Sequence, residues 1–156
     1  MENERLVEQY VRGELDAQGF LPSMIEEQNT INTFIAKGLS AASKVGTGNK
    51  GFPEFIIRFP ARHDTVMIVE CKARKNCHIS SSGNAPVDFA VDGVLHYAKH
   101  LAKFKHHVIA VAVSGINRPL ISTFLVEYDE LGELLIRDIN LNKIEAPPFY
   151  LRLIEE

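Results

Sequence analysis

Residues 108–113, which read VIAVAV, form an unbroken apolar run that constrains the fold more than any other feature of the sequence. A strand with one wet face alternates apolar and polar side chains, whereas a strand covered on both faces reads as a continuous apolar run. Ser114 and Gly115 end the run. A strand of this kind belongs inside a sheet that carries helices on both sides, so we expect an α/β fold with a central mixed β-sheet flanked by helices.

Other segments supply partners for this strand. Residues 54–59 (EFIIRF) and 65–71 (TVMIVEC) are apolar and β-branched, and the short stretch between them predicts an antiparallel hairpin. Residues 88–104 carry apolar side chains at helical spacing. The order strand, helix, strand predicts a right-handed crossover from the hairpin to residues 108–113. Two further strands are expected near residues 121–127 and 134–139.

The N-terminal part predicts two helices. Residues 2–18 are amphipathic, and Gly19 ends that helix. Ser23 begins the second helix, with Glu26 three residues later in the capping-box pattern. That helix should fade near Lys44, before a turn-rich loop over residues 45–51. Its predicted apolar stripe consists of Ile31, Phe34, Ile35 and Leu39.

Length and composition indicate one globular domain over residues 1–156. No apolar run approaches the ~20 residues needed to cross a bilayer, so no membrane partner is expected. The charged N-terminus lacks the apolar stretch of a secretory signal. Cys71 and Cys77 are too few for a disulfide framework, and a reducing, cytoplasmic setting fits them best.

Charge is segregated along the chain. Residues 31–118 hold twelve bases and five acids, net +7, whereas residues 1–30 and 119–156 are each net −5. A basic middle can bind a polyanion. Lysines and arginines that simply solvate the surface would give the same pattern, and charge alone favours that ordinary interpretation.

The chemistry is concentrated in residues 51–59 (GFPEFIIRF) and 67–73 (MIVECKA). Strand alternation puts Glu70 and Lys72 on one face and turns Cys71 the other way, into the core. Glu54 opens the partner strand sixteen residues before Glu70, so a short hairpin brings the two carboxylates together. Two carboxylates and a backbone carbonyl form a hard-oxygen site suited to Mg²⁺.

A Glu-x-Lys triplet is common, and charged residues on strands usually face solvent. Here Glu70 follows the apolar residues 66–69, and its neighbours look buried on at least one face. Ionised groups at the end of a buried strand are costly unless they are paired or bind a metal. The context therefore makes a functional role for Glu70 about as good an interpretation as a structural one.

At these residues the sequence resembles the PD-(D/E)XK nuclease superfamily. Pro53-Glu54 resembles its first acidic position, and Glu70-Cys71-Lys72 its second. More closely, the chain is similar to the N-terminal nuclease domain of type I and type IIG (ISP-like) restriction-modification enzymes. The similarity covers about residues 23–115, and its matching stretches are residues 39–57, 68–73, 90–101 and 108–115.

The resemblance implies a metal-dependent DNA endonuclease. Glu54, Glu70 and the carbonyl of Cys71 would hold Mg²⁺, for which Mn²⁺ could substitute, and Lys72 would position the nucleophile and stabilise the transition state. It also implies a methyltransferase or motor domain as partner in a larger restriction enzyme. A non-catalytic nucleic-acid-binding or assembly domain that retains the nuclease fold is the alternative, although both acids and the lysine are intact.

The family often adds an acid from its first core helix. Glu26 and Glu27 are both candidates, and we favour Glu27 because it shares the face of Ile31 and Phe34, while a capping box would explain Glu26. Many relatives carry Gln-x-x-x-Tyr on the later helix. Here Gly93 stands at the glutamine position before Tyr97, so the glutamine contact is absent.

The remaining polar candidates concern DNA and zinc. Lys50, Arg74, Lys75 and Tyr97 are predicted to contact DNA, although surface solvation explains Arg74 and Lys75 equally well. His96 and His100 have an i, i+4 spacing that zinc sites use, but no third ligand accompanies them on the helix. The sequence holds no phosphate-binding P-loop, which argues against an ATP-driven motor within this chain.

Overall fold

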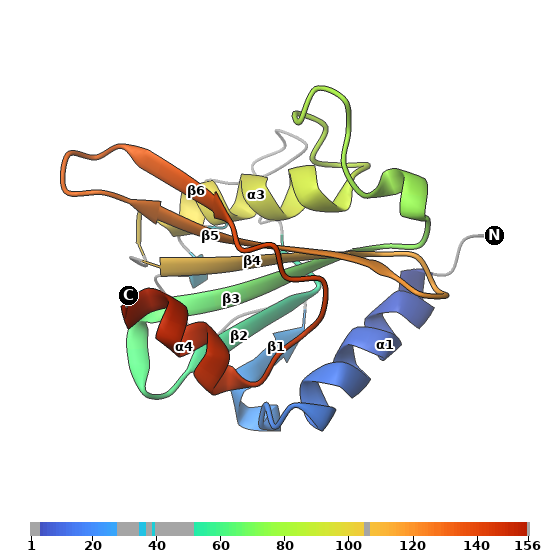
Figure 1. Ribbon diagram of the computed structural model, residues 1–156, viewed down its shortest axis with the longest axis horizontal. Helices are drawn as coiled ribbons and strands as arrows, with labels where there is room; N and C mark the ends of the chain where they lie inside the picture. Colours follow the sequence, from blue (N-terminus) through green and yellow to red (C-terminus); the bar gives the residue numbers. More distant parts are fainter. Residues whose placement is uncertain (1–3, 28–34, 37–38, 40–51, 105–106, 156) are drawn as a thin grey trace.

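The computed structural model describes residues 4–27, 35–36, 39, 52–104 and 107–155 (Figure 1). Six strands form one sheet in the order β1-β2-β3-β4-β5-β6. Their bounds are β1 Ile25–Glu27, β2 Phe55–Phe59, β3 Arg62–Lys72, β4 His107–Ser114, β5 Leu120–Tyr128 and β6 Leu134–Asp138. The helices are α1 Glu4–Ala17, α3 Ala90–Leu101 and α4 Pro147–Glu155.

The sheet is mixed, as predicted. Strands β2 and β3 form the expected antiparallel hairpin. Strand β3 then pairs with β4 in parallel, and α3 lies between them in the sequence. The pairs β1–β2, β4–β5 and β5–β6 are antiparallel. A central mixed sheet with flanking helices is therefore confirmed.

Strand β4 is covered on both faces, which explains its unbroken apolar sequence. Ile109, Val111 and Val113 belong to one core cluster, together with side chains of α1 and α4. Val108, Ala110 and Ala112 belong to the other cluster, together with side chains of α3. Figure 1 shows this layering, with α3 on one side of the sheet and α1 and α4 on the other.

Helix α1 confirms the amphipathic pattern at the N-terminus. Val7, Val11 and Leu15 are buried at i, i+4, i+8 spacing. The chain leaves the helix through Gly19, whose φ of +90° favours a residue without a side chain. The Phe20 N–H donates to the Leu15 carbonyl at 3.0 Å, which closes the helix end.

The helix predicted to begin at Ser23 is wrong over its first residues. Pro22–Met24 form a single 3₁₀ turn, and Ile25–Glu27 form strand β1. The capping-box pattern was misleading because Glu26 and its neighbours pair with β2, Glu26 opposite Ile56. Tertiary pairing overrides a local capping signal of this strength.

The remainder of the predicted second helix falls mainly on residues 28–34, 37–38 and 40–51, outside the described residues. Ile35 and Leu39 are described, helical and buried against the α3 side of the sheet, in agreement with the predicted stripe. The C-terminal helix α4 was not predicted. Within the described ranges, no helix has the length and apolar character needed to cross a membrane.

Candidate functional site

The hairpin brings Glu54 and Glu70 to the same end of the sheet. Phe55, the first residue of β2, pairs with Val69 in the antiparallel ladder. Glu54 comes just before β2 and Glu70 just after Val69, and their side chains are hydrogen-bonded. The arrangement agrees with the sequence prediction that the hairpin joins these two carboxylates.

The two carboxyl groups are hydrogen-bonded to one another, and Glu54 is half-buried. Glu70 is only 2% exposed. Burial, followed by the neighbouring charge of Glu70 and a hydrogen bond with it, raises the pKa of Glu54 to about 10. The Cys71 N–H donates to Glu54 Oε2 at 3.2 Å, and this hydrogen bond lowers the pKa of Glu54. The raised pKa favours a proton on Glu54 at neutral pH.

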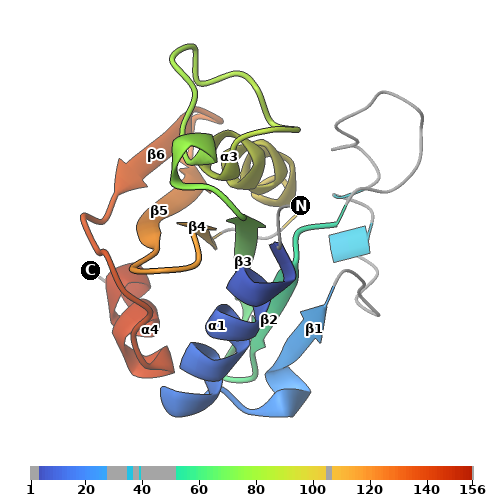
Figure 2. The same cartoon turned by 90° about the vertical axis from the view of Figure 1, so that its right-hand side faces the viewer.

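Helix α1 contributes two more acids to this end of the sheet. One carboxylate oxygen each of Glu4, Glu8 and Glu54 lies within 4.8 Å of the other two. Burial raises the pKa of Glu8, and the charges of Glu27 and Glu70 also raise it against the lowering effect of Arg12 and Arg5. Figure 2 shows the first turns of α1 beside the end of β3 and below α3.

Sequence reasoning missed Glu4 and Glu8. Their i, i+4 spacing in the first turns of the first helix was the available signal, because it puts both on one helical face. Nothing in the spacing indicates that this face meets the end of a strand some sixty residues later. That meeting depends on how α1 packs across the sheet, which is a tertiary property.

Lys72, the last residue of β3, lies beside the acids. Its ammonium donates to the Val87 carbonyl at 2.8 Å and lies 3.9 Å from Glu4 Oε1. The side chain is about one-fifth exposed, so the charge is only partly screened by water. Lys72 therefore joins the acid cluster to the loop between β3 and α3.

That loop is held in place by Asp92, on the first turn of α3. The Ala85 N–H donates to Asp92 Oδ2 at 2.8 Å, and the Ser80 N–H donates to Oδ1 at 3.1 Å. Burial raises the pKa of Asp92, but these hydrogen bonds and one from the Ser80 hydroxyl outweigh it, so the pKa is lowered. The anchored loop fixes the carbonyl that Lys72 contacts.

A cavity of about 410 Å³ opens next to this group, and its walls are Glu4, Lys72, Ala73, Cys77 and Asp88. The Cys71 side chain is not part of it. Cys71 is fully buried in the core cluster on the α1 side, as predicted, and burial followed by the nearby glutamates raises the pKa of its thiol. The predicted metal ligand at Cys71 is its carbonyl, and that role stays a prediction.

Tyr97 approaches the acids from α3. The residue is 4% exposed, and burial, followed by the charges of Glu70 and Glu54, raises the pKa of its hydroxyl. The predicted DNA contact of Tyr97 does not fit this burial. Its hydroxyl instead lies close enough to Glu70 and Glu54 for their charges to raise its pKa.

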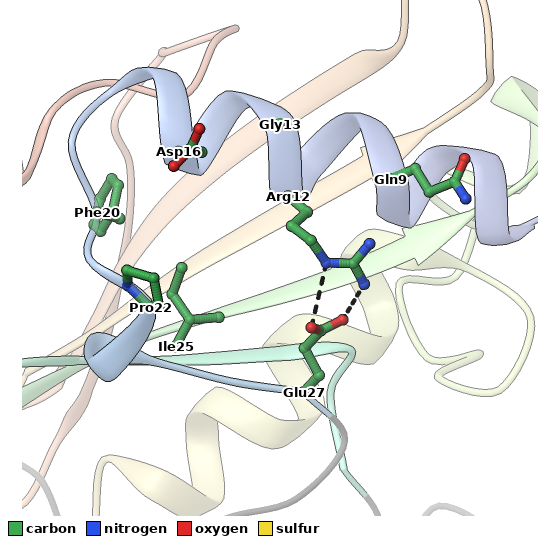
Figure 3. Close-up of a pocket in the computed structure, with 8 residues that line it drawn as sticks. All are labelled: Gln9, Arg12, Gly13, Asp16, Phe20, Pro22, Ile25 and Glu27. Atoms are coloured by element: carbon green, nitrogen blue, oxygen red, sulfur yellow. Dashed lines mark hydrogen bonds and ion pairs between the residues drawn. The ribbon is translucent and has the colours of Figure 1, made fainter.

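The position predicted for the helix acid is corrected by the structure. Glu27 lies on strand β1, is exposed, and forms an ion pair with Arg12, whose Nε donates to Glu27 Oε2 at 3.2 Å. The Oε1 atom of Glu26 lies 3.8 Å from Nε of Arg58. Figure 3 shows the Arg12–Glu27 pair in a groove of about 490 Å³ between α1 and β1. The helical acids near the site are Glu4 and Glu8.

The predicted DNA contacts are divided between exposed and undescribed residues. Arg74 and Lys75 are exposed just after β3. The stem of Lys75 packs on Gly115, where a Cβ would lie 2.6 Å from Lys75 Cγ. Lys50 lies outside the described residues.

The structure gives no support to a zinc site at His96 and His100 among the residues that it describes. The His96 and His100 rings are 5.2 Å apart on α3. Among the described residues, however, the group of three metal-ligating side chains that comes together consists of Glu4, Glu8 and Glu54. The histidine pair is not part of it.

Comparison with other proteins adds no family to this description. Protein-family models, curated proteins and solved structures were each compared with the chain, and none matched.

Proposed function

We propose that this chain is a metal-dependent DNA endonuclease domain whose active centre lies at the end of β3. The observation that carries the proposal is the hydrogen-bonded pair of carboxyl groups, buried Glu70 and half-buried Glu54, which the hairpin brings to one end of the sheet. Two carboxyl groups this close repel each other when both are ionised, unless a proton or a cation lies between them. Such an arrangement is characteristic of sites that bind a cation or transfer protons.

The donor set fits a hard divalent cation. Carboxylate oxygens of Glu54 and Glu70, with Glu8 and Glu4 beside them, are the ligand type that Mg²⁺ and Mn²⁺ take. The proton on Glu54 is the group that a cation would replace. When bound, Mg²⁺ would supply Lewis-acid polarisation of a phosphate and would lower the pKa of water.

Lys72 supplies the positive charge of the protein itself. Its ammonium lies at the wall of the cavity, between Glu4 and the Val87 carbonyl. From there it can donate to a phosphate oxygen or to the attacking water, and its charge would stabilise the extra negative charge of the transition state. A compact ammonium suits this position better than a planar guanidinium.

The proposed substrate is DNA, in keeping with the basic middle of the chain and with Arg74 and Lys75 exposed beside the cavity. Methyltransferase or motor domains of a larger restriction enzyme would be its partners. A binding or assembly domain without catalysis is the alternative, and it requires the same surface but no chemistry at Glu70 or Lys72.

Cleavage of supercoiled plasmid under single-turnover conditions tests the proposal. Wild type should nick DNA in Mg²⁺ or Mn²⁺ and stop in EDTA. Lys72→Ala removes the ammonium and should lower the rate by ~10²-fold or more, the scale of one transition-state donor. Lys72→Arg should not restore the rate. Lys143→Ala is the matched control, because Lys143 is 65% exposed and pairs only with Glu145 among the contacts described.

Two results would contradict the proposal. One is metal-independent cleavage, or the same rate in wild type and Lys72→Ala. The other is tight DNA binding without cleavage in any divalent cation, which would favour the binding-domain alternative.

A further inference from the structure

The edge strand β6 is the most exposed apolar part of the sheet. Four of its five residues are exposed, and they include Leu135 at 49% and Ile136 at 41%. Among the described elements, β6 is the outermost strand on its side, and Figure 2 shows it at the rim of the sheet. Proteins usually protect an edge of this kind with proline, a bulge or a covering segment, because it can pair with another strand.

The hydrogen bonds of the β5–β6 ladder define which groups of β6 point outward. The Asp129 N–H donates to the Glu133 carbonyl at 2.9 Å, and the Ile139 N–H donates to the Thr123 carbonyl at 3.0 Å. Odd-numbered residues from 133 to 139 therefore bond to β5. Leu134, Ile136 and Asp138 direct their N–H and C=O groups to the open edge.

We propose that β6 pairs with β6 of a second copy of this chain, antiparallel, with Leu135 opposite Leu135. The result is a symmetric dimer with one continuous sheet of twelve strands. The inference does not depend on the proposed nuclease function. It depends on the outward-facing groups, on the apolar side chains and on the charges at the two ends of β6.

Hydrogen-bond parity restricts the possible registers. A residue whose N–H and C=O point outward on one copy must lie opposite such a residue on the other copy. Only every second register meets this condition. Leu135 opposite Leu135 satisfies this rule, because Leu134 then exchanges hydrogen bonds with Ile136 of the other copy. Registers in which Leu134 lies opposite Leu134, or Ile136 opposite Ile136, also satisfy the rule.

The charges select one of these registers. With Leu135 on the axis, Glu133 of each copy lies opposite Arg137 of the other, which gives two opposite-charge pairs. Centring on Ile136 would put Arg137 opposite Leu135, and centring on Leu134 would put Asp138 opposite Glu130. The sequence of β6 is thus complementary to itself in one register.

The side chains on each face agree with this register. Leu134 packs on the core beneath α3, and Ile136 lies on the same face opposite Val126. Across the axis, Leu134 and Ile136 would extend that apolar surface into the second copy. On the other face, Leu135 would lie opposite Leu135 of the second copy, with a Glu133–Arg137 pair on each side of it.

The strand is short, so the dimer should be weak and concentration-dependent. Five residues a side bury less than the roughly 1,200 Å² of a standard interface. Sedimentation velocity of the full chain from ~5 to ~500 µM, at low salt, should show the mean mass rising from 17.5 kDa toward twice that value.

A charge swap tests the register directly. Glu133→Arg and Arg137→Glu each create two like-charge pairs, and each should weaken self-association by ~10-fold or more. An equimolar mixture of the two variants restores opposite charges in the mixed dimer and should associate within about threefold of wild type. Arg152→Glu, an exposed change on α4, should have no effect.

Ile136→Pro tests the edge itself. It removes an N–H that points away from β5, so the β5–β6 ladder should stay intact while pairing at the open edge is lost. Circular dichroism of every variant should match wild type. The proposal is overturned by a monomer at all concentrations, by a dimer that Ile136→Pro leaves unchanged, or by variants whose mixture does not associate.

Discussion

The two ends of strand β3 each carry a cluster of charges, but the clusters are built differently. At the beginning, Arg62 donates twice to Asp64, at 3.0 and 2.8 Å. His107 lies 3.6 Å from Asp64 and is also hydrogen-bonded to Glu127. Acids and bases alternate in this group, and its members are part-exposed.

At the far end of β3, acids outnumber bases. Glu54, Glu70, Glu8 and Glu4 come together there. The Lys72 ammonium lies 3.9 Å from Glu4, and the charges of Arg12 and Arg5 lower the pKa of Glu8 against the effect of burial. Glu70 is buried, unlike Asp64. In the first cluster each acid has a base beside it, and we interpret that cluster as structural. The second cluster is the one that we propose to bind a cation.

The pKa directions make the same distinction. Hydrogen bonds from Arg62 lower the pKa of Asp64 despite its partial burial. Burial and Glu70 raise the pKa of Glu54. The carboxyl group of Asp64, at the beginning of β3, is thus stabilised as an anion, and that of Glu54, at the other end, is stabilised in its protonated form.

The largest expected contrast is in metal binding. Glu70→Ala removes a carboxylate from the proposed centre and should weaken Mn²⁺ binding, measured by calorimetric titration, by ~10²-fold or below detection. Asp64→Ala removes a carboxylate from the balanced cluster and should leave Mn²⁺ affinity within about twofold. Equal effects of the two substitutions would remove the distinction between the clusters.

The carboxyl groups at the two ends of β3 should change the free energy of unfolding in opposite directions as pH rises. In EDTA the folded protein keeps a proton on Glu54 that the unfolded chain releases above about pH 4.5, so the folded state binds more protons and stability falls as pH rises. The contribution is on the order of 1 kcal/mol per pH unit. The lowered pKa of Asp64 acts oppositely, because its stabilisation is present above about pH 4 and is lost as pH falls further.

Urea denaturation of wild type and Glu54→Gln between about pH 7 and 8.5 measures the Glu54 effect. The raised pKa of Cys71 also lowers stability toward the upper end of this window, because the thiol ionises in the unfolded chain first, but this contribution is common to both proteins. The wild-type midpoint should fall across the window, and Glu54→Gln should flatten the curve and raise stability at its upper end. A wild-type midpoint that is constant or rises would show that Glu54 is already an anion.

The smallest effect concerns the surface beside the cavity. Arg74→Ala with Lys75→Ala should weaken binding of any duplex DNA by a few-fold and reduce the salt slope by about one to two phosphate contacts. Fluorescence anisotropy over a range of salt concentrations measures both quantities. Affinity that does not depend on salt would mean that these side chains only solvate the surface.

Much of the fold could be predicted because the decisive signals are local. The run at residues 108–113 and the hairpin around residues 60–64 set strands β2 to β4, and alternation placed Cys71 in the core. The joining of Glu54 to Glu70 followed from a short loop. These features need only neighbours in sequence and the period of a strand.

The rest of the site is set by packing between distant segments. Ser23 and Glu26 fit a helix start, yet residues 25–27 gain more by pairing with β2. Glu4 and Glu8 reach the centre because α1 crosses the sheet, and no spacing in the sequence encodes where that helix ends. Glu27 was chosen as a helical residue, but it lies on strand β1 and is paired with Arg12.

The most direct test of the central claim is to locate a bound cation. Crystals of the full chain soaked in Mn²⁺ should show an anomalous peak within coordination distance of carboxylate oxygens of both Glu54 and Glu70, and the peak should be absent in Glu70→Ala crystals. A peak only at Asp64 or Glu127, or none at the end of β3 at millimolar Mn²⁺, would contradict the account.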